Sequence, residues 1–350
     1  MLAARSVGQS ILAQFVDAGA VQVEADILQP AEALLDLYGE DIRGRAFVTH
    51  DPIRGEMMLR PDFTVPVVQA HMAEGAEPAR YAYLGEVFRK QDHRGAARQS
   101  EYLQAGFEVF DRTNPQAADA EVFALIARIL APLHLTATIG DIGLLTASVE
   151  ALQTLPARKS ALLRHIWRPQ RFHALLKRYA GQIPTPPARQ ALLDGAVTDA
   201  PWIGLRSEAE VAARVDRLRE DAAADPISAQ DMARLDALFA LRCPALEAVE
   251  KLRALDLPEA AITRFAARLE ALQAQGVDLA RVKFEASHGR TTMEYYDGFV
   301  FTFKSAPDMP PVASGGRYDA LTRVLGQGRE IPAVGGVIRP ALVAALGGLK

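Results

Sequence analysis

The sequence contains a single cysteine, Cys243, among its 350 residues. One thiol forms neither an internal disulfide nor a cysteine-based metal cluster, so we expect a buried structural thiol in a helical stretch and a reducing, cytoplasmic compartment. No apolar run reaches the roughly 20 residues of a membrane span, since Arg128 interrupts the best candidate, Phe123 to Leu133. Polar residues among the first 20 positions also argue against a signal peptide.

Lysine is scarce, occurring seven times among 39 basic residues, and 43 acidic residues bring the net charge to −4. This balance provides no overall positive field, so we expect no nucleic acid partner. Hydrophobic residues make up 49% and charged residues 23%, a composition typical of globular proteins that excludes general disorder. The length indicates about two structural units.

Generic catalytic signatures are absent. The sequence has no Gly-x4-Gly-Lys-Ser/Thr loop, no Gly-x-Gly-x-x-Gly after a strand and no His-Glu-x-x-His helix. None of its seven histidines lies three or four positions from another, which is the spacing of metal ligands on a helix. We therefore expect no metal, no cofactor and no catalytic residue.

Strand-like patterns occur in two separate parts of the chain. Alternating apolar residues predict strands over 21–27, 81–89, 100–110, 284–287 and 293–303, with a hairpin over 46–59. Helical spacing predicts helices over 5–18, 32–37, 63–73, 117–130 and 320–325, with Thr64 as a possible cap. From about 144 to 281 only helical patterns follow one another. We expect 1–144 and 283–350 to form one α+β core, with 145–282 as a helical insertion.

Five segments stand out by their order. They are Leu59-Arg-Pro-Asp-Phe-Thr64, Tyr83-Leu-Gly-Glu-Val-Phe-Arg89, Leu103-Gln-Ala-Gly-Phe-Glu108, Glu294-Tyr-Tyr-Asp-Gly298 and Gly315-Gly-Arg-Tyr-Asp-Ala-Leu321. Over nearly the whole chain this order resembles the class II histidyl-tRNA synthetases. The resemblance implies a mixed, mostly antiparallel sheet flanked by helices. It also places Pro30 where that family has the proline of its dimer interface, which implies a homodimer.

Together with the resemblance, the side chains of these segments suit a free amino acid, L-histidine. Carboxylate and amide oxygens meet an ammonium group, a guanidinium binds a carboxylate, a second carboxylate accepts from an imidazole N–H, and phenol rings flank the ring. These roles fall to Asp62 and Gln104, to Arg89, to Glu108, and to Tyr295 and Tyr296, with Thr64 adding a hydroxyl. Taken singly, Asp62 capping a helix and an Arg89–Glu108 cross-strand pair are equally open.

Three departures from the synthetase pattern concern ATP and the transition state. Gln91 stands where motif 2 has a glutamate, and Thr291 where the segment before the double tyrosine has an arginine, with Arg290 one position early. Motif 3 lacks its arginine in register, and we expect Pro340 to disturb the helix there. Such changes imply a chain that keeps the amino-acid pocket without forming an adenylate.

This combination resembles the regulatory subunit of ATP phosphoribosyltransferase, a synthetase-like chain without an anticodon-binding domain. Its members also carry Leu-Arg-Pro-Asp-x-Thr, with aspartate as here. The resemblance implies a non-catalytic partner of the short-form catalytic subunit in a hetero-oligomer, with feedback regulation of histidine biosynthesis by histidine. Two alternatives stay open, namely a ligase that forms histidyl-adenylate and a structural subunit whose pocket is empty.

Overall fold

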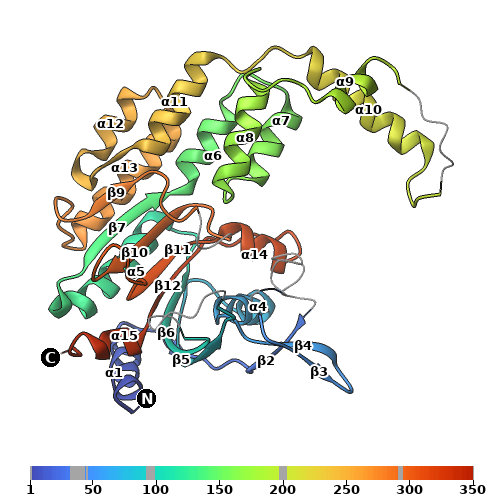
Figure 1. The fold of residues 1–350 in the computed structure, drawn as a ribbon. Helices are drawn as coiled ribbons and strands as arrows, with labels where there is room; N and C mark the ends of the chain where they lie inside the picture. Colours follow the sequence, from blue (N-terminus) through green and yellow to red (C-terminus); the bar gives the residue numbers. More distant parts are fainter. Residues whose placement is uncertain are drawn as a thin grey trace. The chain divides into compact units, whose positions relative to one another are not determined.

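The computed structural model describes residues 2–31, 44, 46–91, 99–196, 203–290 and 295–349. The chain divides into two compact units (Figure 1). Unit 1 joins Met1–Leu144 to Ala240–Lys350, and unit 2 is Leu145–Phe239. Among the described residues, no helix combines the length and the apolar character of a membrane-spanning segment.

Unit 1 is built on a nine-stranded mixed sheet with the order β1-β5-β6-β12-β11-β10-β7-β9-β8. In the described part of the chain, β1 pairs with β5 and β7 with β9 in parallel, while the other neighbours are antiparallel. The predicted fold class is confirmed. In sheet order the strands are Val21–Gln22, Ala79–Phe88, Glu101–Phe110, Ala333–Ile338, Ala313–Arg317, Phe299–Lys304, Thr136–Asp141, Lys283–Glu285 and Arg242–Pro244.

Helices cover both faces of this sheet. On one face α1 (Leu2–Asp17), α5 (Pro115–Leu130) and α15 (Pro340–Ala345) pack against β6 and β12, and α13 (Glu259–Ala274) packs on α5. Phe15 of α1 meets Phe107 of β6 there, with ring centroids 5.4 Å apart. On the other face lie α4 (Thr64–Glu74) and α14 (Asp319–Leu325). His71 of α4 and Tyr318, which directly precedes α14, both approach Phe110 of β6. The candidate site lies on this second face.

A small second sheet of unit 1 has the order β2-β4-β3, comprising Leu28–Pro30, Gly55–Leu59 and Val48–Asp51. The predicted hairpin over 46–59 is thereby confirmed, as Figure 1 shows. The single strand predicted over 21–27 is wrong, because the chain passes from β1 in the large sheet to β2 in the small one. The predicted helix over 32–37 lies outside the described residues.

The predicted insertion, 145–282, is longer than unit 2, because residues 240–282 belong to unit 1. Two contacts hold them there: β8 pairs with β9, and α13 packs on α5. Cys243 lies in the middle of β8 and is partly exposed, so the expected buried thiol in a helix is wrong. Short 3₁₀ helices follow α5 (Ala131–Leu133) and β8 (Ala245–Glu247), and α12 spans Ala248–Ala254.

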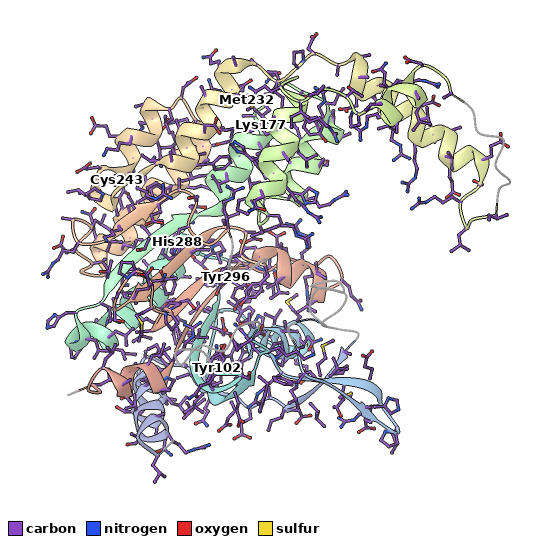
Figure 2. The ribbon with its side chains drawn as sticks, in the orientation of Figure 1. Tyr102, Lys177, Met232, Cys243, His288 and Tyr296 are labelled. Carbon is purple, nitrogen blue, oxygen red and sulfur yellow. The ribbon has the colours of Figure 1, made fainter. Side chains whose placement is uncertain are left out.

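Unit 2 is helical in its described part. Its apolar core includes Phe172, Leu176 and Tyr179 of α8 with Met232 and Leu235 of α11. Figure 2 labels Met232 in this core and Lys177 on the exposed side of α8. The helices are α7 (Pro156–Arg164), α8 (Pro169–Tyr179), α9 (Pro187–Leu193), α10 (Glu208–Ala223) and α11 (Ala229–Ala240), while α6 (Ile142–Glu150) crosses from unit 1.

Candidate functional site

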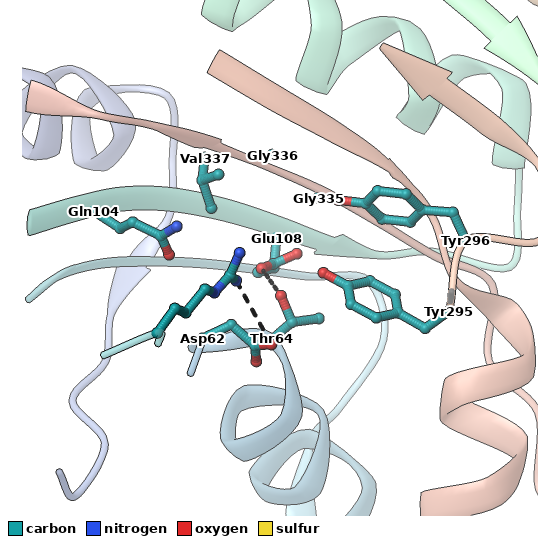
Figure 3. Close-up of a pocket in the computed structure, with 10 residues that line it drawn as sticks. Asp62, Thr64, Gln104, Glu108, Tyr295, Tyr296, Gly335, Gly336 and Val337 are labelled. Atoms are coloured by element: carbon teal, nitrogen blue, oxygen red, sulfur yellow. Dashed lines mark hydrogen bonds and ion pairs between the residues drawn. The ribbon is translucent and has the colours of Figure 1, made fainter. Parts of the chain in front are cut away.

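One pocket lies on the α4 face of the large sheet (Figure 3), with about 280 Å³ of space free of protein atoms when the open solvent at its mouth is counted. The strands β5, β6 and β12, the start of α4 and the segment before β10 contribute its walls. All seven side chains predicted to form a site line it, although they are spread over more than 230 positions of the sequence. They are Asp62, Thr64, Arg89, Gln104, Glu108, Tyr295 and Tyr296, joined by Gly335, Gly336 and Val337.

Glu108 lies at one end of the pocket and is almost completely buried. Its Oε1 accepts hydrogen bonds from the hydroxyls of Thr64 (3.1 Å) and Tyr83 (3.0 Å), and its Oε2 accepts one from Tyr318 (2.6 Å). Burial raises the pKa of Glu108 to about 7, although the three hydroxyl donors oppose that shift. The carboxyl group therefore exchanges its proton near neutral pH.

Space for this carboxylate depends on a glycine in the neighbouring strand. Gly335 is the register partner of Glu108, and a Cβ added there would lie 1.4 Å from Oε2 of Glu108. Gly106 makes room for Tyr83 in the same way, because a Cβ added at Gly106 would lie 2.0 Å from the ring carbon Cζ of Tyr83. The glycines let two large polar side chains lie flat on the sheet.

Asp62 and Thr64 enter the pocket from the start of α4. Phe63 occupies the N-cap position without a side-chain bond, and Thr64 donates to Glu108, so the prediction that Thr64 caps this helix is wrong. Oδ1 of Asp62 accepts a long bond from the backbone N–H of Val65 (3.4 Å), as the capping alternative expected. Its Oδ2 lies 4.0 Å from Nη2 of Arg89 (Figure 3), so Asp62 faces both the helix and the pocket.

Arg89 and Gln104 provide the polar groups of the pocket centre. Nε of Arg89 donates to the carbonyl of Pro61 (2.7 Å). The alternative of an Arg89–Glu108 cross-strand pair is wrong, because the register places Glu108 opposite Tyr81. Gln104 is 1% exposed, and its Oε1 has no hydrogen-bond partner among the residues that the structure describes. A buried carbonyl of this kind is a ready acceptor for a ligand N–H.

Tyr295 and Tyr296 form an aromatic wall. Their rings meet edge to face with centroids 4.7 Å apart, and the ring of Tyr296 lies over Gly316 of β11. Burial raises the pKa of both phenols, so the hydroxyls stay protonated and are able to donate at neutral pH. The wall thus offers a flat apolar surface with polar edges, which suits a small aromatic ring.

Tyr83, Tyr318 and the glycine-rich start of β12 were not predicted to belong to the site. Tyr318 lies in the Gly-Gly-Arg-Tyr-Asp segment, so the motif already contained its signal. Tyr83 reaches Glu108 across Gly106, its own register partner. Only the pairing of β5 with β6 reveals that contact.

Comparison with known proteins gives a consistent assignment. The sequence model of the histidyl-tRNA synthetase family matches residues 2–341. The chain is 35% identical to the ATP phosphoribosyltransferase regulatory subunit of Agrobacterium fabrum, covering 93% of this chain and 92% of that one. It is 34% identical to the protein of the same name from Mesorhizobium japonicum, covering 89% and 90%. The chain belongs to the histidyl-tRNA synthetase-like family of ATP phosphoribosyltransferase regulatory subunits.

Solved structures of this family share the fold. A Bacillus halodurans protein, described as an ATP phosphoribosyltransferase regulatory subunit/histidyl-tRNA synthetase, superposes with a TM-score of 0.67 at 24% identity. That match covers 98% of this chain and 79% of the other. Histidyl-tRNA synthetase from a Nostoc species superposes with a TM-score of 0.65 at 15% identity, covering 99% and 72%. At these identities the likeness establishes the fold alone.

Only some of the positions at which this chain departs from the synthetase pattern lie among the residues that the structure describes. The side-chain amide of Gln91 donates to the carbonyl of Arg89 (3.1 Å), which ties it to its own strand end. Pro340 begins α15 at its first position, where the missing N–H is tolerated, so the expectation that it disturbs the helix is wrong. Thr291 lies outside the described residues, and Arg290 is buried.

Proposed function

We propose that this chain is a non-catalytic regulatory subunit of an ATP phosphoribosyltransferase and that its pocket binds L-histidine as a feedback signal. The regulatory-subunit name of relatives over nearly the whole chain supports the first part. The observation that carries the second part is the polarity of the pocket. A buried carboxylate, a guanidinium and a buried amide oxygen that has no partner among the described residues all line the same pocket.

In this proposal each end of the pocket recognises one part of histidine. Glu108 accepts from the imidazole N–H, while Tyr295 and Tyr296 flank the ring. Gln104 Oε1 and Asp62 accept from the ammonium group, and Arg89 binds the carboxylate. Every polar group of the ligand then meets a group of opposite character, which selects histidine over apolar amino acids of similar size.

Regulation follows from differential affinity. Histidine inhibits the partner only to the extent that it binds the inactive state of the complex more tightly than the active one. We place the short-form catalytic subunit in a hetero-oligomer with this chain, which itself forms a homodimer. The pocket then acts at a distance from the partner's chemistry, without a catalytic residue of its own.

A pair of titrations tests this proposal with the Glu108→Gln variant, which keeps the shape of the side chain and removes its charge. We expect histidine affinity, measured by calorimetry, to fall about ten- to a hundred-fold. Inhibition of the partner's turnover should move to correspondingly higher histidine while activation by this chain stays intact. Glu270→Gln, on the exposed side of α13, is the matched control. Identical inhibition curves for wild type and Glu108→Gln would contradict the assignment.

The family match to histidyl-tRNA synthetase supports a second candidate, a ligase that forms histidyl-adenylate. Gln91 and the displaced motif 3 arginine argue against it, since each lost charge contact costs roughly 10²- to 10³-fold in rate. We expect no histidine-dependent exchange of pyrophosphate into ATP by the purified chain. Exchange at the rate of a synthetase would favour the ligase.

A further inference from the structure

Arg339 lies on the pocket face of the sheet, directly after β12. Side chains alternate along a strand, so Arg339 shares its face with Val337 and Gly335, which line the pocket. Gly335 pairs with Glu108, and the register continued to the end of β12 brings Arg339 beside Gln104. The backbone N–H of Arg339 donates to the carbonyl of Val312 (2.9 Å), which fixes its position on β11.

The guanidinium of Arg339 is anchored over β11 by two hydrogen bonds. Nη1 donates to the carbonyl of Pro311 (2.8 Å) and Nη2 to Oγ of Ser314 (3.2 Å). Ser314 is the register partner of Val337, so the guanidinium lies next to a pocket wall.

No carboxylate in the described part of the chain forms an ion pair with Arg339. Burial lowers its pKa, the guanidinium of Arg89 acts in the same direction, and the phenols of Tyr102 and Tyr296 oppose it. Arg317, on the preceding strand, is instead paired with Asp119 at 2.7 Å. A partly buried cation next to a second cation costs free energy until an anion arrives.

We propose that Arg339 is a specificity-determining residue of the pocket and binds, together with Arg89, the carboxylate of the amino acid held there. This inference rests on the proposed function. The register places Arg339 beside Gln104, whose Oε1 the proposed function assigns to the ammonium group, so Arg339 lies near the end of the ligand that carries the α-amino group and the carboxylate. Two guanidiniums then share one carboxylate, which also relieves their mutual repulsion.

The test compares L-histidine with L-histidinol, which carries an alcohol in place of the carboxylate. We expect Arg339→Met to weaken histidine binding about ten- to a hundred-fold by calorimetry. Histidinol affinity should change by less than about twofold, because that ligand lacks the group that Arg339 binds. Arg339→Lys should recover part of the loss for histidine alone. Arg112→Met, at an exposed arginine of the same unit, is the matched control.

Different failures have different meanings. Equal loss for both ligands in Arg339→Met would make Arg339 a structural residue, and unchanged histidine affinity would place it outside the site. Either result overturns this inference and leaves the proposed function standing. If wild-type protein binds neither ligand, the proposed function fails and this inference fails with it. A circular dichroism spectrum and melting curve for each variant exclude unfolding as the cause of a loss.

Discussion

The carboxylate of Glu108 accepts hydrogen bonds from three hydroxyls that come from three separate elements. No cation in the described part of the chain forms an ion pair with it. The hydroxyls stabilise the negative charge without neutralising it. The effect of burial is larger than theirs, so the pKa of Glu108 is raised to about 7. An empty pocket therefore keeps a destabilised carboxylate ready for a ligand donor.

This raised pKa gives the stability of the free protein a pH dependence. The unfolded carboxyl group ionises near pH 4.5 and the folded one near 7, so the folded state binds the extra proton between these values. Its contribution is fully present below about pH 4.5 and is lost as the pH rises through 7. We expect Glu108→Gln to gain on the order of 3 kcal/mol of relative stability from pH 5 to 8. Urea unfolding at both pH values measures it, with Glu270→Gln expected to follow wild type.

Gly335→Ala tests the space beside the same carboxylate. An added methyl group would lie 1.4 Å from Oε2 of Glu108, so the side chain must leave its hydroxyl donors or the strands must separate. We expect a loss of about 1–3 kcal/mol in stability, measured by urea unfolding, together with loss of histidine binding. Gly204→Ala, where no atom lies closer than 4.0 Å to the added carbon, should change neither. An unchanged midpoint for Gly335→Ala would contradict the described packing.

At the scale of elements, a buried ion network connects five elements of unit 1. Asp119 of α5 accepts from Arg268 of α13 (2.6 Å) and from Arg317 of β11 (2.7 Å). Arg268 also pairs with Asp141 at the end of β7, and Arg317 with Asp319 of α14 (3.0 Å). The network holds β11 and α14 on either side of Tyr318, which donates to Glu108. The network therefore helps to fix the position of Tyr318 and, through its hydrogen bond, that of Glu108.

Removing Arg268 leaves the buried carboxylate of Asp141 without its cation and leaves Asp119 with Arg317 alone. We expect Arg268→Met to lower the free energy of unfolding by about 3–5 kcal/mol. Lys251→Met removes an exposed partner of Glu247 and should leave the free energy of unfolding essentially unchanged. Chemical denaturation of both variants at pH 7.5 measures the difference. Equal midpoints for the two variants would show that the network adds nothing to stability.

Elements with a strong local pattern were predicted and others were not. The ten-residue segments of β5 and β6 were recognised because aromatic and β-branched residues recur along each of them. β7 and β8 were missed, since β8 has only three residues, including a proline, and is a strand only through its pairing with β9. The seven site residues came from the order of family motifs, whereas the contact of Tyr83 depends on cross-strand register, which no single segment contains.

At the scale of the whole molecule, the small sheet β2-β4-β3 leaves apolar side chains exposed, among them Val48 and Ile53. The resemblance places Pro30, the last residue of β2, at a dimer interface. We expect a homodimer of twice 37.9 kDa by light scattering at micromolar concentration. A double variant, Val48→Lys with Ile53→Lys, should shift the measured mass toward that of the monomer. Leu246→Lys, at an exposed leucine outside the small sheet, should not. A monomeric wild type would contradict this expectation.

The pairing of β6 with β12 joins residues 105–110 to residues 333–338 in the centre of the large sheet. A ribosome that adds 5–20 residues per second needs roughly 11–45 s to travel from the first strand to the second. During that time the β6 edge that later receives β12 has no partner, and such an edge readily pairs with other chains. The pocket is thus complete only after β12 has been synthesised, and nascent chains acquire the ability to bind a ligand only from that point on.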